Sequence, residues 1–471
     1  MASLWVVPGA PLEKGGGWRI WFSQAGDDYF DPPRPIEVRH NGAPQRVDDS
    51  SWKVFEPLEG LTRRMGVLTV KLYDPKPGKR YEVTIPTVGT FRWRSLPSSI
   101  DEQGTSFLVA SCFWLPGDKE GAYRRSVIEV SRIFDPTFKL LIGDQIYHDW
   151  PLHQPQRNIP KLFGERYEAY WGDAYYRDVL SSAPNFFTCD DHEFWNNYPE
   201  KQIWLWQTYD RVREESKKAA QETYLRFQRS LNPEEGRFYR FDIDPVSFFV
   251  TDSRSERGDI DADRNAHAFS NEQWTKLKEW AEGLRGPGVI VLGQPLFDEK
   301  GDWRDRSLAS FEADFARLCA VFEDSLKQTE TRDPHDILIL TGDIHTGRYA
   351  AATLVGRQPA AYVHEFVTSP ASRVGPFVGA VKPREPPAGF TFRRDGTERK
   401  WEIAKVDELS RTIDDNIAVV RMRPWGGRVL FELELWRVRT RDPRPFLKRF
   451  LRKGPQQGPV VRIFRKELKL R

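Results

Sequence analysis

Six short apolar segments constrain the fold of this 471-residue chain more than any other feature. Each has five or six residues, is mostly apolar and ends in a small or polar residue: FLVASC (107–112), FKLLIG (138–143), NFFTC (185–189), SFFVTD (247–252), VIVLG (289–293) and ILILTG (337–342). Such segments are typical of strands buried on both faces, as in a largely parallel sheet. Stretches with apolar residues at helical spacing lie between them, at 122–134 and at about 307–328. The alternation predicts an α/β domain with a buried central sheet.

The regions before and after these segments have a different character. Residues 1–96 contain short alternating segments separated by Gly, Pro and Asp turns, which predict a small all-β sandwich of the immunoglobulin or fibronectin type III kind. The α/β domain is expected over residues 106–436, and residues 437–471 form a basic C-terminal extension. Four later segments of the α/β domain predict further strands of a second sheet packed on the first: 351–355, 362–369, 417–423 and 428–438.

The C-terminal extension concentrates the positive charge of the chain. The net charge is only +3, but residues 437–471 carry 13 Lys or Arg and 2 Asp or Glu, so the remainder is acidic. A basic segment attracts anionic partners, although a solvated arginine-rich surface is the commoner reason for such a composition. Pro443, Pro445 and Pro455 interrupt any continuous basic helix and argue against a nucleic-acid partner. The sequence leaves the oligomeric state open.

Cysteine usage and the N-terminus bear on the compartment. Cys112, Cys189 and Cys319 are odd in number and widely spaced, which does not describe a disulfide framework and fits a reducing environment. No run reaches the roughly 18 apolar residues of a membrane span. The stretch MASLWVVPGAPLEKGGG has neither the basic start nor the apolar centre of an export signal. We therefore expect a cytoplasmic protein without a membrane partner.

Polar side chains follow five of the six apolar segments. They are Ser111 and Cys112, Asp144 with Tyr147 close behind, the run Asp190 to Glu193, Asp252 with Arg254, and Asp343 with His345. Because the carboxyl ends of strands form the ligand-binding crevice of an open α/β sheet, we expect these side chains to meet. Each alone is more often a turn, a helix cap or a packed side chain. Together they predict a metal site, because several carboxylates around a histidine are costly to bury without a cation or a proton.

The order of these motifs resembles the PhoD-like (alkaline phosphatase D) branch of the calcineurin-like metallophosphoesterases. Cys112 stands where the wider superfamily has an Asp on its first strand, and Gly143-Asp144 matches the GD motif of the second strand. Asp191-His192 stands where Asn-His is expected, and GDIH (342–345) stands where GHxH is expected. The resemblance covers about residues 106–370. It implies an α/β fold with a metallophosphoesterase-type β-sandwich core flanked by helices, preceded by a small all-β domain.

The resemblance also implies how the metal site is built. The expected ligands are the thiol, phenol, carboxylates and imidazole of the strand ends: Cys112, Asp144, Tyr147, Asp191, Asp343 and His345. Asp144 would bridge two ions. Cys112 and Tyr147 would favour a trivalent ion such as Fe³⁺. The oxygen-rich partner position suits a hard divalent ion, first Ca²⁺, with Mn²⁺ or Mg²⁺ as alternatives, and the ligands would also tolerate Zn²⁺.

Three further residues are expected to act on the substrate. The matched role of His192 is a proton donor to the leaving-group oxygen or the phosphoryl group, oriented by a neighbouring carboxylate. Arg254 would clamp a phosphate oxygen, with pairing to Asp252 or Glu256 as the equal alternative. Asn196 follows the DDHE motif closely enough to reach a metal or a phosphate.

One position departs from the superfamily pattern. Where the superfamily has a metal-binding His before a Pro, this chain has Gly293-Gln294-Pro295, so a ligand is missing unless Gln294 substitutes for it. We expect metal-dependent hydrolysis of a small phosphoester, with phosphodiesters slightly ahead of phosphomonoesters. The alternatives are a non-catalytic phosphate- or nucleotide-binding member of the same fold, and a nuclease drawn to its substrate by the basic C-terminus.

Overall fold

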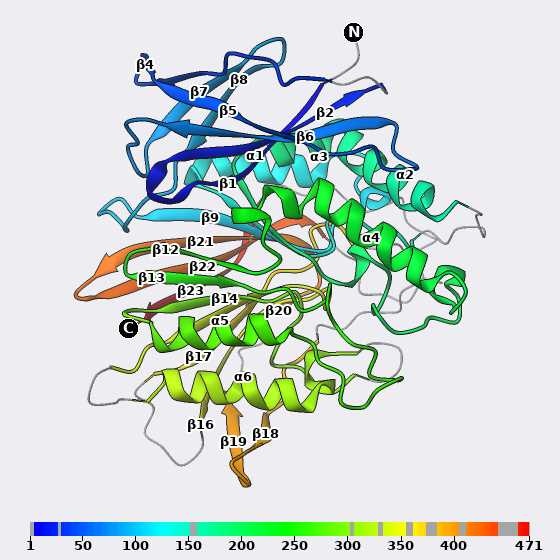
Figure 1. Cartoon of the computed structure of the whole chain (residues 1–471). Coiled ribbons are helices and arrows are strands. Elements are labelled where there is room, and N and C mark those ends of the chain that lie inside the picture. The colour runs from blue at the N-terminus through cyan, green and yellow to red at the C-terminus, as the bar shows by residue number, and fades with distance from the viewer. Residues whose placement is uncertain are drawn as a thin grey trace.

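A computed structural model gives the fold of the chain (Figure 1). It describes these residues: 4–26, 30–150, 158–301, 306–327, 333–354, 361–373, 384–404, 411–440 and 460–470. Two large sheets are stacked in the middle of the molecule, with the N-terminal strands on one side and helices α5 and α6 on the other.

The N-terminal strands form two four-stranded antiparallel sheets. The first has the order β1 (Trp5–Pro11), β2 (Gly17–Ala25), β6 (Arg63–Leu72) and β5 (Val47–Val54). The second has the order β4 (Ala43–Gln45), β3 (Glu37–His40), β7 (Arg80–Ile85) and β8 (Gly89–Arg94). Their inner faces share one apolar core that includes Trp18, Val70 and Trp93. The all-β expectation for this region agrees with these strands, and its assignment to the immunoglobulin or fibronectin kind stays a prediction.

The first large sheet has six strands. Its order is β11 (Asn185–Thr188), β10 (Lys139–Ile142), β9 (Thr105–Ala110), β21 (Asp415–Trp425), β22 (Arg428–Arg439) and β23 (Arg462–Leu470). Strands β9, β10 and β11 are parallel, as the apolar segments predict. The later strands join antiparallel, so they complete this first sheet as well as the second.

The second large sheet has nine strands. Eight follow the order β12 (Tyr239–Ile243), β13 (Val246–Val250), β14 (Gly288–Val291), β15 (Ile337–Thr341), β17 (Val363–Val367), β16 (Gly347–Leu354), β19 (Thr397–Ile403) and β18 (Gly389–Arg394). The ninth, β20 (Arg411–Thr412), pairs with β16. Strands β13, β14, β15 and β17 are parallel and form the central part of this sheet.

A shared apolar core holds the two large sheets face to face. Phe107 and Leu140 of the first sheet belong to the same buried cluster as Phe248 and Leu338 of the second. Their outer faces are covered by helices: α1 (Ala122–Phe134), α2 (Ile159–Gly172), α3 (Ala174–Ser181) and α4 (Arg213–Phe227) on the first, and α5 (Asn271–Glu282) and α6 (Glu312–Ser325) on the second. The architecture is a β-sandwich flanked by helices, in which sheet residues outnumber helical ones.

The described part of the C-terminal extension, residues 437–440 and 460–470, is part of this sandwich, and residues 441–459 lie outside the described residues. The expected boundary at residue 437 lies inside β22, and β23 pairs with β22 along its whole length as the edge strand. Glu432 and Glu434 of β22 form ion pairs with arginines of the neighbouring strands: Arg421, Arg423, Arg462 and Arg465. Part of the basic charge at this end therefore neutralises glutamates on the sheet face.

Candidate metal centre

The site lies where parallel strands of both large sheets end. Cys112, Asp144, Asp190 and Asp343 each stand two residues beyond their strands, β9, β10, β11 and β15. Cys112, Asp144 and Asp343 have φ angles of 56°, 53° and 66°, and His345 has 52°. This left-handed region is uncommon for residues other than glycine, and such conformations cluster at functional sites. The local backbone therefore turns sharply after β9, β10 and β15, which brings these side chains together with Asp190.

Four carboxylates form the centre of the site, three of them buried and that of Asp343 half-buried. Asp144, Asp190, Asp191 and Asp343 each offer an oxygen, and these four oxygens lie within 4.8 Å of one another. A nitrogen of His192 lies within the same distance of Asp144 and Asp191 oxygens. Oδ2 of Asp190 and Oδ1 of Asp191 are buried and accept no hydrogen bond from the described residues. Unpaired carboxylate oxygens in such number fit a cation, because burying them without one is costly.

The thiol and phenol lie against the same carboxylates. Sγ of Cys112 lies 3.3 Å from Oδ2 of Asp144, and the Tyr147 hydroxyl lies 3.4 Å from the same oxygen. The Tyr147 hydroxyl also lies 3.4 Å from Nε2 of His345. The structure thus brings the sulfur and phenol that we expected to hold iron against Asp144, with the His345 imidazole beside the phenol.

Burial dominates the ionisation of these groups. Burial raises the pKa of Asp144 well above its ordinary value, and the carboxylates of Asp191 and Asp190 raise it further against the effect of His192. Burial also raises the pKa of Cys112 and of Tyr147, and Asp144 adds to both shifts. Ligands of this kind exchange protons for a cation, so the donor set and its burial fit the bound metal that the sequence predicts.

His192 has a partner that fixes its orientation. Its Nδ1 lies 2.7 Å from Oδ1 of Asp149, whose Oδ2 accepts the backbone N–H of Asn196 at 2.8 Å. Burial opposes the charged imidazole, but the carboxylates of Asp149, Asp191 and Asp144 outweigh it, so the pKa of His192 lies well above its ordinary value. Because Asp149 accepts a hydrogen bond from Nδ1, Nε2 is the ring nitrogen that remains available to donate a proton. Asp149 is the neighbouring carboxylate that the sequence implied without identifying.

Glu193 and Asp190 contribute in ways that sequence reasoning missed. Glu193 accepts the backbone N–H groups of Asp144, Gln145 and Asp190 at 2.7–2.9 Å, so it ties the ends of β10 and β11 together. Burial raises its pKa to about 7 against these hydrogen bonds. Asp190 joins the carboxylate group beside Asp191. The run of acidic residues around His192 was the available signal, but sequence alone did not say which carboxylate faces which atom.

Arg254 and Asn196 were expected to contact the substrate, and the structure shows their contacts with neighbouring protein groups. The Arg254 side chain is 1% exposed, and its Nε lies 2.5 Å from Oδ1 of Asp190 while Nη1 donates to the carbonyl of Tyr198. Its side chain thus neutralises Asp190, a partner that the sequence had not suggested. Asn196 donates its backbone N–H to Asp149. Substrate contact by either residue stays a prediction.

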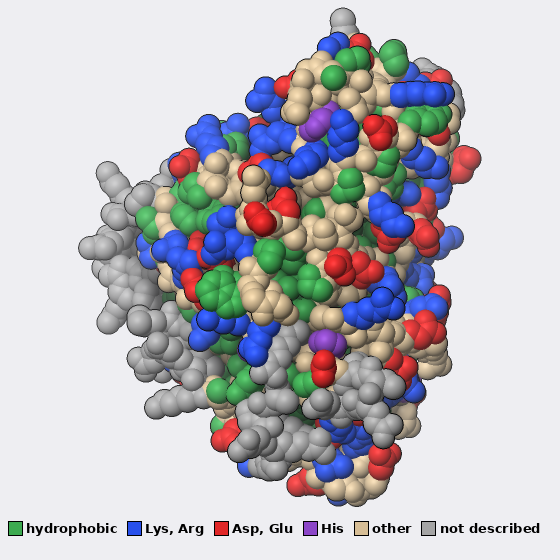
Figure 2. All heavy atoms as spheres, turned by 90° about the vertical axis from the view of Figure 1, so that its left-hand side faces the viewer, with side chains coloured by type: hydrophobic (Ala, Val, Ile, Leu, Met, Phe, Trp, Pro, Cys, Tyr) green, Lys and Arg blue, Asp and Glu red, His purple; other side chains and the backbone are tan. Residues whose placement is uncertain are grey.

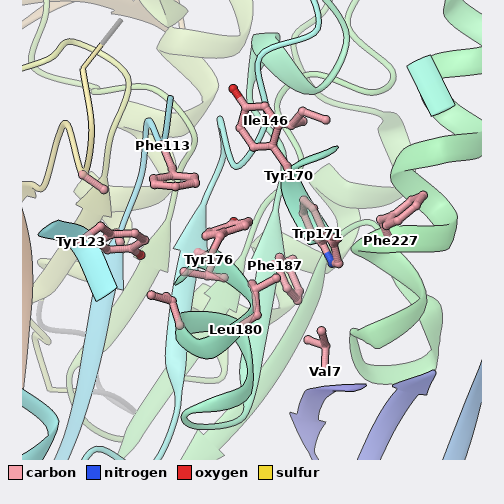
Figure 3. Packing of buried hydrophobic residues seen from close by; sticks show 14 of the residues in the cluster. Val7, Phe113, Tyr123, Ile146, Tyr170, Trp171, Tyr176, Leu180, Phe187 and Phe227 are labelled. Atoms are coloured by element: carbon pink, nitrogen blue, oxygen red, sulfur yellow. The ribbon is translucent and has the colours of Figure 1, made fainter. Parts of the chain in front are cut away.

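An aromatic cluster packs around the residues that follow β9 and β10 (Figure 3). Phe113, directly after Cys112, stacks on Tyr176 with ring centroids 4.3 Å apart, and Ile146 lies in the same buried cluster between Asp144 and Tyr147 in the sequence. Figure 3 shows Tyr170, Trp171 and Phe227 packed beside them. Side chains so enclosed have little freedom, which preorganises the polar groups attached to the same loops.

Most of the site lies in a segment that is similar to a known protein family. Residues 107–295 match the sequence profile described as PhoD-like phosphatase. This segment of the chain is thus similar in sequence to the PhoD-like phosphatases. The family segment contains every strand end described above except that of β15, which carries Asp343 and His345. A search of the curated proteins finds no significant match.

Solved structures extend the likeness to most of the chain at the level of the fold. The structure of PhoD superimposes with a TM-score of 0.61 and 16% identity, covering 92% of this chain and 86% of that one. A second structure, GAP50, the anchor in the inner membrane complex of Plasmodium, gives a TM-score of 0.38 and 9% identity over 78% of this chain and 89% of that one. The match to the family profile and the PhoD-like fold thus confirm the resemblance that the motifs predicted.

Two features bear on the expectations about compartment. Cys112, Cys189 and Cys319 are all free and buried. Among the described helices, none combines the length and apolar character needed to cross a bilayer.

Proposed function

We propose that this protein hydrolyses phosphate esters by a metal-activated water at a dinuclear site, with phosphodiesters slightly preferred over phosphomonoesters. The observation that carries the proposal is the group of four carboxylates, three of them buried, beside the His192–Asp149 pair. Asp144, Asp190 and Asp191 lie at strand ends within residues 107–295, the segment that matches the PhoD-like phosphatase profile. The substrate is a small phosphoester.

The metal ligands we propose are those of the sequence: Cys112, Asp144, Tyr147, Asp191, Asp343 and His345. Cys112 and Tyr147, on one side of Asp144, suit Fe³⁺. Asp191 and Asp343 suit a hard divalent ion, first Ca²⁺, then Mn²⁺, Mg²⁺ or Zn²⁺. Two bound cations neutralise phosphoryl oxygens and lower the pKa of a coordinated water.

His192 supplies the proton in this proposal. Asp149 holds Nδ1, so Nε2 carries the transferable proton in this proposal. The neighbouring carboxylates raise the pKa of His192 and so favour the protonated imidazole, which in this proposal donates its proton to the leaving-group oxygen as the ester bond breaks. Rising pH removes this proton, so activity falls on the basic side.

Arg254 is proposed both to position Asp190 and to contribute positive charge to the substrate site. Arg254 is fully enclosed between Asp190 and the Tyr198 carbonyl, so we infer that it fixes Asp190 and contributes positive charge where the anionic phosphoryl group docks. Asn196, half-buried beside Asp149, is the second residue proposed to contact substrate.

The two alternative functions have weaker support. A non-catalytic phosphate-binding protein has no need for the proton donor that Asp149 orients. For a nuclease, the basic C-terminal strand would have to present free positive charge, yet arginines of β23 pair with glutamates of β22. Figure 2 shows Lys and Arg side chains interspersed with Asp and Glu over the face on the left-hand side of Figure 1.

The test combines elemental analysis with two substitutions. Wild-type protein should carry iron and a divalent ion, and should cleave a nitrophenyl phosphodiester and a nitrophenyl phosphomonoester. His192→Ala should lower kcat by about 10²–10⁴-fold while leaving the metal content unchanged. Asp144→Asn should lose both metal and activity.

The half-buried His40 of β3, 72 positions before Cys112 in the sequence, provides the histidine control as His40→Ala. Loss of metal in His192→Ala would reassign His192 as a ligand. Wild-type protein that retains no metal after exposure to iron, manganese, zinc and calcium would refute the catalytic proposal and favour the phosphate-binding alternative.

A further inference from the structure

The position that departs from the superfamily pattern lies in the middle of a buried hydrogen-bonded chain. Gln294 follows β14 and is 2% exposed. Its Oε1 lies 2.7 Å from Nη2 of Arg257, and its Nε2 lies 3.2 Å from Oδ2 of Asp343. Nε2 also lies 3.2 Å from the backbone carbonyl of Arg306. One amide group thus connects a buried arginine to a carboxylate of the metal centre.

The partners fix which way this amide points. A guanidinium can only donate, so the atom facing Arg257 must be the oxygen. A backbone carbonyl and a carboxylate can only accept, so the atom facing Arg306 and Asp343 must be the nitrogen. Three neighbours thus agree on one orientation. In that orientation the amide offers Asp343 an N–H group, and its oxygen is already used by Arg257.

Arg257 is itself held in place. Its side chain is 2% exposed, its Nε donates to the carbonyl of Ser253 at 2.8 Å, and its guanidinium lies 4.7 Å from the ring centroid of Phe311. Turning the Gln294 amide over would place an NH₂ group against this fixed cation. Because both would then be unsatisfied donors in a buried place, the reversed orientation is strongly disfavoured.

The neighbouring residue cannot take over a ligand role. A Cβ at Gly293 would lie 3.0 Å from Oδ1 of Asp190 and 3.0 Å from the carbonyl of Cys189. Contacts this close leave no room for a side chain that reaches the metal centre from this position. Gln294 is therefore the residue whose side chain can take the place of the expected histidine.

We propose that Gln294 is a positioning residue: Arg257 orients its amide, and the amide N–H holds Asp343 for metal binding in place of a direct nitrogen ligand. This inference rests on the proposed function, because it takes Asp343 as a ligand. It adds that Asp343 would supply a carboxylate oxygen to the divalent ion, and that the Gln294 amide N–H would donate a hydrogen bond to the same carboxylate. Partners of this kind orient ligands and tune the affinity of the metal they hold.

Replacing Gln294 by Glu and by Leu separates this role from direct ligation. Metal-free protein would be titrated with Mn²⁺ alone by calorimetry, and the bound metal counted by elemental analysis. A ligand role predicts that Gln294→Glu strengthens binding, because a carboxylate is the better ligand. The positioning role predicts that Gln294→Glu weakens binding, because the new carboxylate keeps the acceptor for Arg257 but repels Asp343. Gln294→Leu should weaken Mn²⁺ binding by about 10–100-fold.

The buried Gln202 gives the matched control. It is 1% exposed, and its side-chain amide makes no hydrogen bond to the described residues, so Gln202→Leu should bind Mn²⁺ as the wild type does. Thermal unfolding of each variant checks that it is folded. Unchanged Mn²⁺ affinity in Gln294→Leu, or tighter binding by Gln294→Glu, would overturn the positioning role while leaving the proposed function standing. Wild-type protein that binds neither Mn²⁺ nor any other ion would overturn both.

Discussion

Two buried clusters of charge in the sandwich differ in how their carboxylates are satisfied. Glu365, in β17, is fully buried and pairs with Arg348 at 3.2 Å, while its other oxygen accepts the N–H groups of Leu296 and Phe297 at 2.6 and 2.9 Å. The metal centre instead gathers four carboxylates, two of which have a buried oxygen that accepts no hydrogen bond from the described residues. Both oxygens of the Glu365 carboxylate have partners in the fold. The second cluster carries unpaired carboxylate oxygens that fit a bound cation, and we take that excess of negative charge as the mark of a functional site rather than a structural ion pair.

Breaking the balanced pair should have the largest effect on stability. Arg348→Met leaves the Glu365 carboxylate buried without its cation, so the free energy of unfolding should fall by about 3–5 kcal/mol with metal content unchanged. Urea denaturation of the metal-free protein measures the change. In the same assay Asp144→Asn should raise the stability, because it removes one of the crowded carboxylates.

An exposed cation gives the control for that comparison. Lys278→Met removes a partner of Glu282 where both side chains are more than 60% exposed, and should change the stability by less than about 0.5 kcal/mol. Equal effects of Arg348→Met and Lys278→Met, or destabilisation by Asp144→Asn, would mean that the two clusters do not differ as described.

Acid should act on β17 through His364, beside Glu365. Burial, followed by the charge of Lys466, lowers the pKa of His364 to about 4 from the ordinary 6.5. A depressed histidine pKa gives stability that is present above about pH 6.5 and lost as the pH falls to about 4, by about 3 kcal/mol in total. His364→Gln keeps an acceptor for the Tyr349 hydroxyl, which lies 2.9 Å from Nδ1, and should remove this part of the acid sensitivity.

Denaturation curves recorded from pH 4 to 7 for wild type and His364→Gln measure the difference. Parallel curves for the two proteins would show that His364 is not the titrating group. The metal centre should respond in the opposite direction, because burial raises the pKa of Asp144 and protonation there favours the folded state.

Added Mn²⁺ should stabilise the protein through the metal centre and not through the Arg348–Glu365 pair. Mn²⁺ at about 100 times its dissociation constant should raise the stability of metal-free protein by about 2.7 kcal/mol, and more strongly at higher pH as Asp144 gives up its proton. Arg348→Met should gain the same increment, whereas Asp144→Asn should gain none. Thermal unfolding with and without Mn²⁺ measures the shift. A similar gain in Asp144→Asn would place the ion elsewhere.

Much of this molecule was already determined by its sequence. The apolar segments predict all six central strands and the helix at 122–134, because strands buried on both faces and amphipathic helices leave simple periodic patterns. The strand-end motifs predict the chemical types at the site and the family, since each motif lies within a few residues of the chain. The all-β character of the N-terminal strands follows from the same alternation.

Only the tertiary structure decided which groups face one another. The pairing of Arg254 with Asp190, of Asp149 with His192 and of Gln294 with Arg257 joins residues separated by 64, 43 and 37 positions. The same holds for the addition of β21 and β22 to the first sheet, which no local pattern specifies. Hydrogen bonds and ion pairs depend on distance and direction in space, and these are set by how the two sheets stack. Sequence therefore named the chemistry of the site, and packing assigned each atom its partner.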